Sequence, residues 1–169
     1  MTIPLPIETE RLLIREFEEA DADPMANVYG DPDVMRHVYF GVLDRAGTAA
    51  LLEHYRRAQE RDGFSTWAVV EKESASVVGD VGFGVYAPTG EPELGYTLAA
   101  AVWGRGYGIE AARACVAAAS AHLPHRRLVA KIEPGNGRSL RLAERLGMRP
   151  VETISVDGRP HVLLELEIA

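Results

Sequence analysis

Apolar and polar residues follow strand-like and helix-like patterns along most of the chain. Arg11–Phe17 alternates in the manner of a strand, and Thr48–Arg61 has apolar residues three and four positions apart, which is typical of an amphipathic helix. Other segments with strand-like patterns are Thr66–Glu71, Val77–Tyr86, Glu93–Leu98, Arg127–Ile132, Val151–Val156 and Val162–Ile168. Further helices are predicted at Ala22–Tyr29, Pro32–Val38, Tyr107–Leu123 (alanine-rich) and Gly137–Leu146.

The order of these elements predicts an α+β fold. Strands follow one another before the alanine-rich helix and alternate with helices around it, so we expect a mixed, mostly antiparallel sheet that is parallel around that helix. The last two strands are expected to form a hairpin across Asp157–Gly158. The length of 169 residues predicts one domain over residues 1–169.

Composition excludes several classes of protein. A single cysteine, Cys115, rules out an internal disulfide framework and a cysteine-based zinc site, and no histidine spacing indicates another metal site. No uncharged stretch, the alanine-rich Ala114–Leu123 included, is long enough to cross a bilayer, and the N-terminus lacks the pattern of a secretory signal. We therefore expect a cytoplasmic monomer or homodimer without a membrane partner.

Charge is distributed unevenly. Residues 1–102 contain 8 Lys and Arg against 18 Asp and Glu, whereas Trp103–Arg149 contains 9 basic residues against 3 acidic ones. This asymmetry indicates one anionic ligand and one cationic ligand, although solvated surface charge explains it as well. With a pI of about 5.3 and no basic stretch interleaved with aromatic residues, a nucleic-acid partner is not expected.

The densest motif is the glycine turn Trp103–Glu110, WGRGYGIE, between a predicted strand and a predicted helix. Backbone N–H groups in such a turn, together with the helix start, favour an anion, and Arg105 and Arg113 can add charged contacts to a phosphate. A glycine-rich turn can also serve only to join a strand to a helix. The P-loop pattern is absent, and a Rossmann turn would need glycine where the chain has Ile109.

At this point the sequence resembles the GNAT acetyltransferase superfamily, in the branch similar to ribosomal-protein N-terminal-alanine acetyltransferases. The resemblance rests on ETERLLIREF, DPDVMRHV, ELGYTLAAAVWGRGYGIEAA and EPGNGRSLRLAERLGM, and it extends over nearly the whole chain. One departure is Trp103, where many members have Arg or Gln. The resemblance implies a GNAT fold with a sheet splayed between its fourth and fifth predicted strands, Glu93–Leu98 and Arg127–Ile132, with acetyl-CoA bound in the opening.

The resemblance also implies which residues contact acetyl-CoA. Its pyrophosphate would lie on the glycine turn, and Asn136 corresponds to an asparagine that binds the pantetheine arm, although Asn also suits a helix N-cap. The residues expected to bind the cosubstrate are Leu98, Trp103, Gly104, Arg105, Gly106, Tyr107, Gly108, Ile109, Asn136 and Ser139.

Acetyl transfer to an amine needs a base, a donor to the carbonyl oxygen and an acid for the thiolate. By analogy with the family, Glu93 is the first candidate base, and the Leu98 backbone N–H is the expected donor. Asp80 is a second candidate base, with a polar residue on the outer face of the sheet as the alternative. Many members place a tyrosine acid at the position of Ala143, so Ser139 is the predicted substitute.

These residues predict an N-acetyltransferase acting on a primary amine by direct attack in a ternary complex. The alternatives are a catalytically silent acyl-CoA-binding or sensing domain, suggested by Ala143, and a dinucleotide-dependent oxidoreductase. The acceptor is left open among a protein N-terminus, an aminoglycoside, a polyamine and an amino acid. Tyr39, Phe40 and Trp67 are expected in the core or in a pocket wall, and the first two are candidates for shaping the acceptor cleft.

Overall fold

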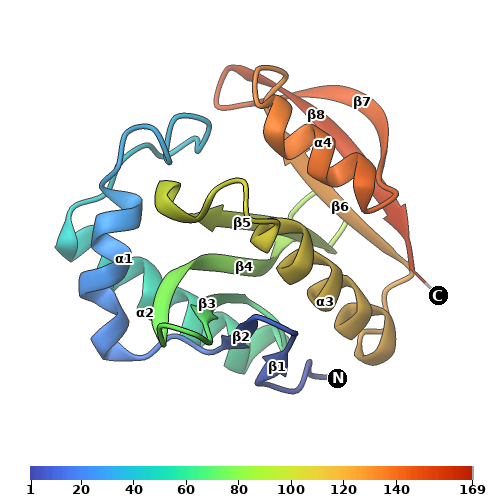
Figure 1. The fold of residues 1–169 in the computed structure, drawn as a ribbon. Coiled ribbons are helices and arrows are strands. Elements are labelled where there is room, and N and C mark those ends of the chain that lie inside the picture. The colour runs from blue at the N-terminus through green and yellow to red at the C-terminus, as the bar shows by residue number, and fades with distance from the viewer. Residues whose placement is uncertain (169) are drawn as a thin grey trace.

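A computed structural model describes residues 1–168, whose strands form one sheet in the order β1-β2-β3-β4-β5-β6-β8-β7 (Figure 1). All neighbouring strands are antiparallel except β5 and β6. The strands are β1 Ile7–Glu8, β2 Leu12–Arg15, β3 Thr66–Glu71, β4 Ser76–Tyr86, β5 Glu91–Leu98, β6 Arg127–Ile132, β7 Arg149–Val156 and β8 Arg159–Glu167. The fold is therefore the predicted α+β class with a mixed, mostly antiparallel sheet.

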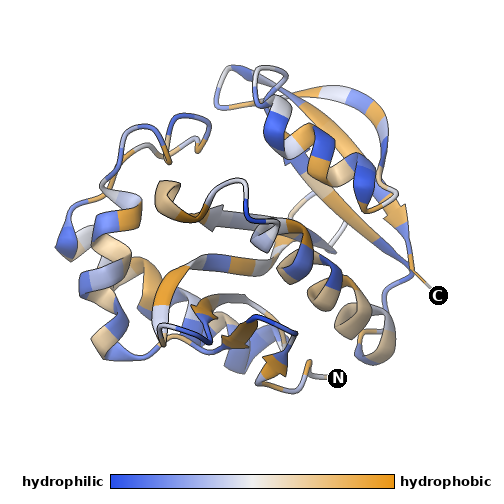
Figure 2. Ribbon diagram, in the orientation of Figure 1, coloured by the Kyte–Doolittle hydropathy of each residue, from blue (hydrophilic) through white to orange (hydrophobic). Residues whose placement is uncertain are grey.

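Helices cover both faces of this sheet. They are α1 Ala22–Tyr29, α2 Arg45–Asp62, α3 Tyr107–His122 and α4 Gly137–Arg145, with short 3-10 turns η1 Glu19–Asp21 and η2 Ala100–Val102. The first two helices pack on one face, and α3 and α4 pack on the other, around the larger part of the core. Figure 2 shows hydrophobic and hydrophilic bands alternating along α4, as expected for a helix with one buried side. None of the helices in residues 1–168 combines the length and apolar character that crossing a membrane requires.

The sheet opens between β5 and β6. The two strands are parallel and are paired at a single register position, Glu93 with Val129. The crossover between them contains the glycine turn and α3, because parallel neighbours need a long connection. Past Glu93 the two strands separate, which leaves the facing edge of β5 without a partner strand.

One predicted element is wrong. Pro32–Val38 is not a helix but a series of turns, and the Asp31 side chain accepts a hydrogen bond of 2.9 Å from the Asp33 backbone N–H. Such local bonds compete with helix formation in a short segment. The strand β1 was not predicted. Several element boundaries also differ by a few residues; α2, for example, begins at Arg45 because Asp44 caps its N-terminus by accepting a hydrogen bond from Gly47 N.

Candidate active site

A cleft of about 1290 Å³ lies where β5 and β6 separate. Side chains alternate along β5, so Tyr96 and Leu98 point towards α3 and α4, while Glu93 and Thr97 point towards the face covered by α1 and α2. The cleft therefore has two sides, one beside the glycine turn and α4 and the other beside Glu93. We call them the turn side and the carboxylate side.

The glycine turn presents backbone donors to the turn side. Gly104 and Gly106 have φ angles of +77° and +80°, which L residues with side chains rarely adopt. The first backbone hydrogen bond of α3 runs from the Glu110 N–H to the carbonyl of Gly106, at 3.2 Å. The N–H groups of the first turn before it have no intrahelical acceptor and lie at the positive end of the helix dipole.

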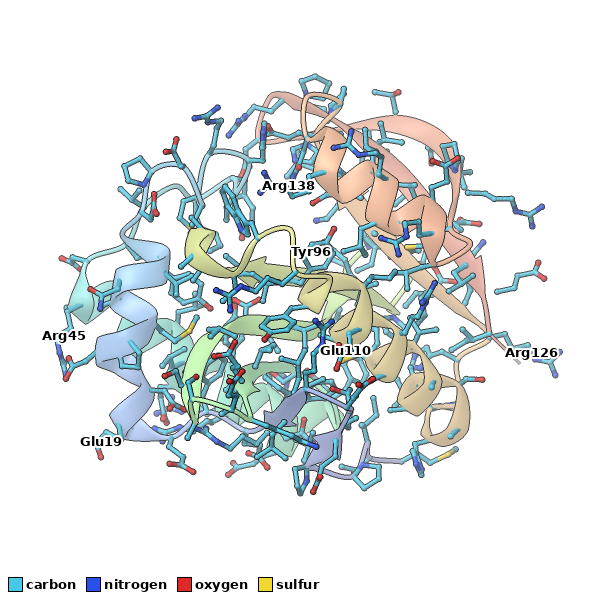
Figure 3. The ribbon with its side chains drawn as sticks, viewed as in Figure 1. Glu19, Arg45, Tyr96, Glu110, Arg126 and Arg138 are labelled. Carbon is cyan, nitrogen blue, oxygen red and sulfur yellow. The ribbon has the colours of Figure 1, made fainter. Side chains whose placement is uncertain are left out.

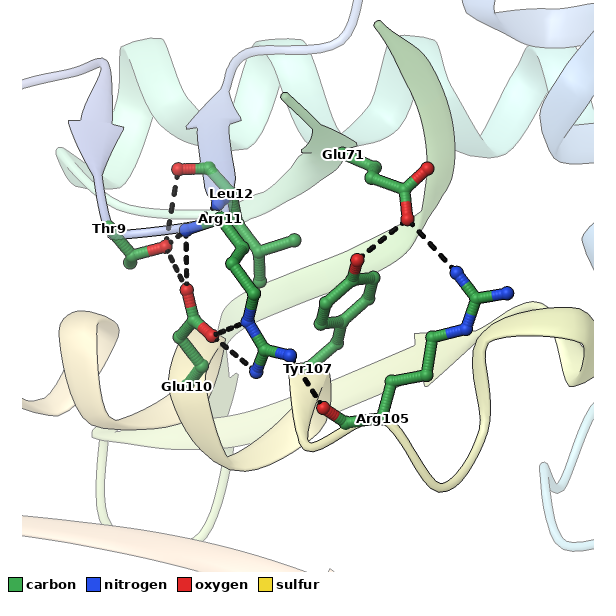
Figure 4. Close-up of polar contacts among 7 residues, drawn as sticks. All are labelled: Thr9, Arg11, Leu12, Glu71, Arg105, Tyr107 and Glu110. Carbon is green, nitrogen blue, oxygen red and sulfur yellow. Dashed lines mark hydrogen bonds and ion pairs between the residues drawn. The ribbon is translucent and has the colours of Figure 1, made fainter. Parts of the chain in front are cut away.

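Residues outside the cleft hold this turn in place (Figure 4). Arg11 donates to Glu110 Oε2 at 2.7 Å and to the carbonyl of Arg105 at 2.8 Å, and its guanidinium lies over the ring of Tyr107. Glu71 accepts hydrogen bonds from the Tyr107 hydroxyl at 2.6 Å and from Arg105 at 3.2 Å. The side chain of Arg105 is therefore engaged by Glu71 instead of lying free beside the turn.

Three arginines of α4 line the cleft instead. Arg138, Arg141 and Arg145 are spaced three and four apart, so they share one face of the helix. In the part of the chain that the structure describes, none of them forms an ion pair with a carboxylate. By contrast Arg113 lies on α3 and lines a separate hollow of about 390 Å³. Arg36 and Lys131 also line the cleft but are ion-paired with Asp33 and Glu93, so the unpaired positive charge comes from α4. In the sequence the α4 arginines count towards the basic segment Trp103–Arg149, but no motif singles them out as phosphate contacts.

Trp103 joins the end of β5 to α4. Its indole N–H donates to the carbonyl of Leu98 at 2.9 Å, and the guanidinium of Arg138 lies 3.9 Å from its ring centroid. The neighbouring Ala99 N–H is bonded to Val78 of β4, so the Leu98 N–H lies on the opposite edge of the strand, towards the opening. Figure 3 labels Arg138 and Tyr96 on elements that border this opening.

The start of α4 contributes polar groups to the turn side. Asn136 caps the helix by accepting a hydrogen bond of 3.3 Å from Ser139 N, which leaves its amide N–H donors unused by the cap. The Tyr96 hydroxyl lies 3.5 Å from the carbonyl of Ser139, and Ala143 is buried one turn further along the same helix face. Tyr96 is a hydroxyl that sequence reasoning missed, although strand alternation places it beside Leu98.

On the carboxylate side Glu93 forms an ion pair with Lys131 of β6, at 3.2 Å. Burial raises the pKa of Glu93 above its ordinary value, while the charges of Lys131 and His161 act in the opposite direction. A carboxylate that holds its proton more tightly than usual is a better base near neutral pH.

Comparison with known proteins places this geometry in a family. The family model described as the acetyltransferase (GNAT) domain matches residues 11–149, most of the chain. The chain belongs to the GNAT acetyltransferase family. It is 32% identical over 160 residues to the uncharacterized protein YkkB of Bacillus subtilis, covering 93% of this chain and 92% of that protein.

Solved structures share this GNAT fold. A GNAT-family acetyltransferase from Bacillus anthracis superposes with a TM-score of 0.86 at 24% identity, covering 96% of this chain and 98% of that one. RimL, a ribosomal L7/L12 α-N-protein acetyltransferase solved in complex with coenzyme A, superposes with a TM-score of 0.82 at 15% identity, covering 99% and 98% of the two chains.

In this GNAT chain the carboxylate side of the cleft is bordered by two aromatic side chains and by a glutamate that contacts two basic residues. Tyr39 and Phe40 line the cleft, are exposed and contact each other edge to face, whereas Trp67 is buried in the core. Glu133, also at the cleft, contacts His37 at 3.0 Å and Arg159 at 2.5 Å. Within residues 1–168 no group of three or more His, Cys, Asp or Glu side chains is arranged to hold a metal ion.

Proposed function

We propose that this protein is an N-acetyltransferase that moves the acetyl group of acetyl-CoA to a primary amine by direct attack in a ternary complex. The observation that carries the proposal is the two-sided cleft. Anion-binding groups, namely the glycine turn and the three α4 arginines, line one side, and the partly buried carboxylate of Glu93 lies on the other.

The turn side fits a CoA ester. Free N–H groups from the glycine turn would hold the pyrophosphate, and Arg138, Arg141 and Arg145 supply positive charge that no carboxylate of the described chain neutralises. The edge of β5 past Glu93 and the amide of Asn136 offer hydrogen bonds to the amide groups of a pantetheine arm. The complex of RimL with coenzyme A, a protein of the same fold, supports this placement.

Bound there, the thioester supplies an activated acetyl group. The Leu98 N–H stabilises negative charge that develops on the carbonyl oxygen, and Glu93 accepts a proton from the amine, directly or through water. The new C–N bond forms as the C–S bond breaks, and the thiolate leaves as the thiol after a hydroxyl protonates it. Ser139 is the candidate donor, and Tyr96 lies close enough to the same helix turn to share the role.

The cleft has Ala143 where a tyrosine acid is common, which also fits a catalytically silent acyl-CoA-binding domain of the same fold. One experiment distinguishes this domain from an acetyltransferase. The chain is incubated with acetyl-CoA and, in turn, with peptides of different N-termini, polyamines, aminoglycosides and amino acids, and free thiol is measured. Amine-dependent release of CoA is expected for an enzyme. Tight binding of acetyl-CoA without amine-dependent release from any acceptor would favour the silent domain.

A further inference from the structure

A second carboxylate lies close to the cleft without a cation. Asp80 of β4 is 4% exposed and belongs to none of the ion pairs among residues 1–168. Asp21 is equally buried, but Arg15 approaches it to 2.7 Å. Burying a carboxylate without a cation costs free energy, which indicates that Asp80 has a role other than stabilising the fold. The alternative expected for Asp80 is a polar residue on the outer face of the sheet, whereas α1 covers this face and buries the carboxylate.

Hydroxyl groups connect this carboxylate to the carboxylate side of the cleft. The Tyr29 hydroxyl of α1 donates a short hydrogen bond to Asp80 Oδ2, and Tyr29 in turn interacts with the hydroxyl of Tyr55 on α2. Tyr55 lines the cleft, as does Thr97 of β5, which also hydrogen-bonds to Asp80. From β3, the residue paired with Asp80 is Ala68. The groups that face Asp80 from its neighbouring elements are therefore hydroxyls and the backbone N–H of Thr97, and no charge offsets its own.

This environment adjusts the proton affinity of each member. Burial raises the pKa of Asp80 to about 7, although hydrogen bonds from Tyr29 and Thr97 act to lower it. Burial and the charge of Asp80 raise the pKa values of Tyr29 and Tyr55 above their ordinary range. Both phenols therefore stay protonated near neutral pH and can pass a proton by accepting one as they give one up.

We propose that Asp80 is a second proton acceptor of the cleft, reached through the hydroxyls of Tyr55 and Tyr29, that converts a bound ammonium into the amine that attacks. The proposal rests on the proposed acetyl transfer. An ammonium acceptor gives up two protons in that reaction, of which one ends on the CoA thiol and the other leaves the enzyme. Glu93, paired with Lys131, serves the attack itself.

The step is balanced. One N–H bond of the ammonium breaks and an O–H bond forms at Tyr55, while the Tyr55 proton moves to Tyr29 and the Tyr29 proton moves to Asp80. The positive charge of the ammonium and the negative charge of Asp80 are both removed. After the product leaves, the proton returns along the same hydroxyls to water.

The test compares two amine acceptors of the same shape, one with a pKa near 10 and a fluorinated analogue with a pKa below the assay pH. Wild type, Asp80→Asn and Tyr55→Phe are assayed for kcat from pH 6 to 9. We expect Asp80→Asn to lower kcat for the basic amine by about a hundredfold at neutral pH and to spare the fluorinated amine, which binds as the neutral amine and loses only the proton that Glu93 accepts. Tyr55→Phe should show the same selectivity with a smaller loss, because Thr97 still reaches Asp80.

The control is Asp21→Asn, which removes a buried carboxylate outside the cleft and should affect both amines equally. Equal losses for both amines in Asp80→Asn and in Tyr55→Phe would overturn the relay and leave Asp80 a structural residue. If the wild type acetylates neither amine nor any other acceptor, the proposed function itself fails, and the two failures are thereby distinguished.

Discussion

Arg11 Nε donates a hydrogen bond of 2.7 Å to Glu110 Oε2, between residues 99 positions apart in the chain. The same guanidinium reaches the carbonyl of Arg105 within the glycine turn. Arg11, in the bend between β1 and β2, therefore fixes the loop that would hold the pyrophosphate, without lining the cleft itself.

Replacing Arg11 should consequently weaken acetyl-CoA binding from a distance. We expect Arg11→Ala to raise the Kd for acetyl-CoA about fivefold to tenfold, or about 1 to 1.4 kcal/mol, with kcat at saturation nearly unchanged. Lys72→Ala is the matched control, since Lys72 bonds to Glu8 and Thr9 on the same surface but does not touch the turn. Equal Kd values for wild type and Arg11→Ala, measured by calorimetry, would show that the contact does not position the turn.

The α4 arginines should contribute through charge. We expect Arg141→Ala to weaken acetyl-CoA binding about tenfold at low salt, because a charged contact to a phosphate is lost, and to reduce the dependence of Kd on salt concentration. Arg149→Ala, on β7 and outside the cleft lining, should leave both quantities unchanged. An unchanged salt dependence in Arg141→Ala would exclude Arg141 from the phosphate site.

Glu93→Gln separates catalysis from binding. Turnover should fall about a hundredfold with the Kd for acetyl-CoA nearly unchanged, since Glu93 lies on the carboxylate side. In wild type, kcat should decrease as the pH falls through the pKa of Glu93, which lies above its ordinary value. Glu91→Gln is the control on the same strand, because Glu91 is ion-paired with Arg127 away from the cleft. Equal activity of Glu93→Gln and wild type across the pH range would refute the assignment of the base.

Asp80 should affect the pH dependence of the free energy of unfolding as well as the rate of acetyl transfer. Its pKa is raised from 3.8 to about 7 by folding, so between these values the folded chain holds a proton that the unfolded chain has lost, and stability falls as the pH rises. Asp80→Asn has no such loss. We expect its free energy of unfolding, relative to wild type, to increase by at least about 1.4 kcal/mol from pH 5 to pH 8, measured by urea denaturation. A constant difference would contradict an uncompensated buried carboxylate.

Local chemistry made part of this site predictable from the sequence. Glycines at and just before the start of a helix specify an N-terminus open to an anion, and alternation in Glu93–Leu98 specifies which residues share a face. The order of strands around the alanine-rich helix likewise predicted the parallel pair at the cleft. Each of these inferences depends on residues that are close together in the chain.

The rest depends on tertiary packing that spacing does not encode. Arg105 lies in the motif but is engaged by Glu71, whereas Arg138, Arg141 and Arg145 reach the cleft because α4 packs with that face towards the opening. Asp80 is buried because α1, distant in sequence, covers its strand.

The central claim is that acetyl-CoA binds on the glycine turn between β5 and β6, and calorimetric titration of Gly106→Val tests it most directly. A control, Gly90→Val, introduces the same left-handed strain (φ +77°) in an exposed turn between β4 and β5. We predict that wild type and Gly90→Val bind acetyl-CoA with equal affinity and that Gly106→Val binds at least about tenfold more weakly, or 1.4 kcal/mol. Equal affinity in all three proteins, or no binding of acetyl-CoA to wild type, would contradict the account.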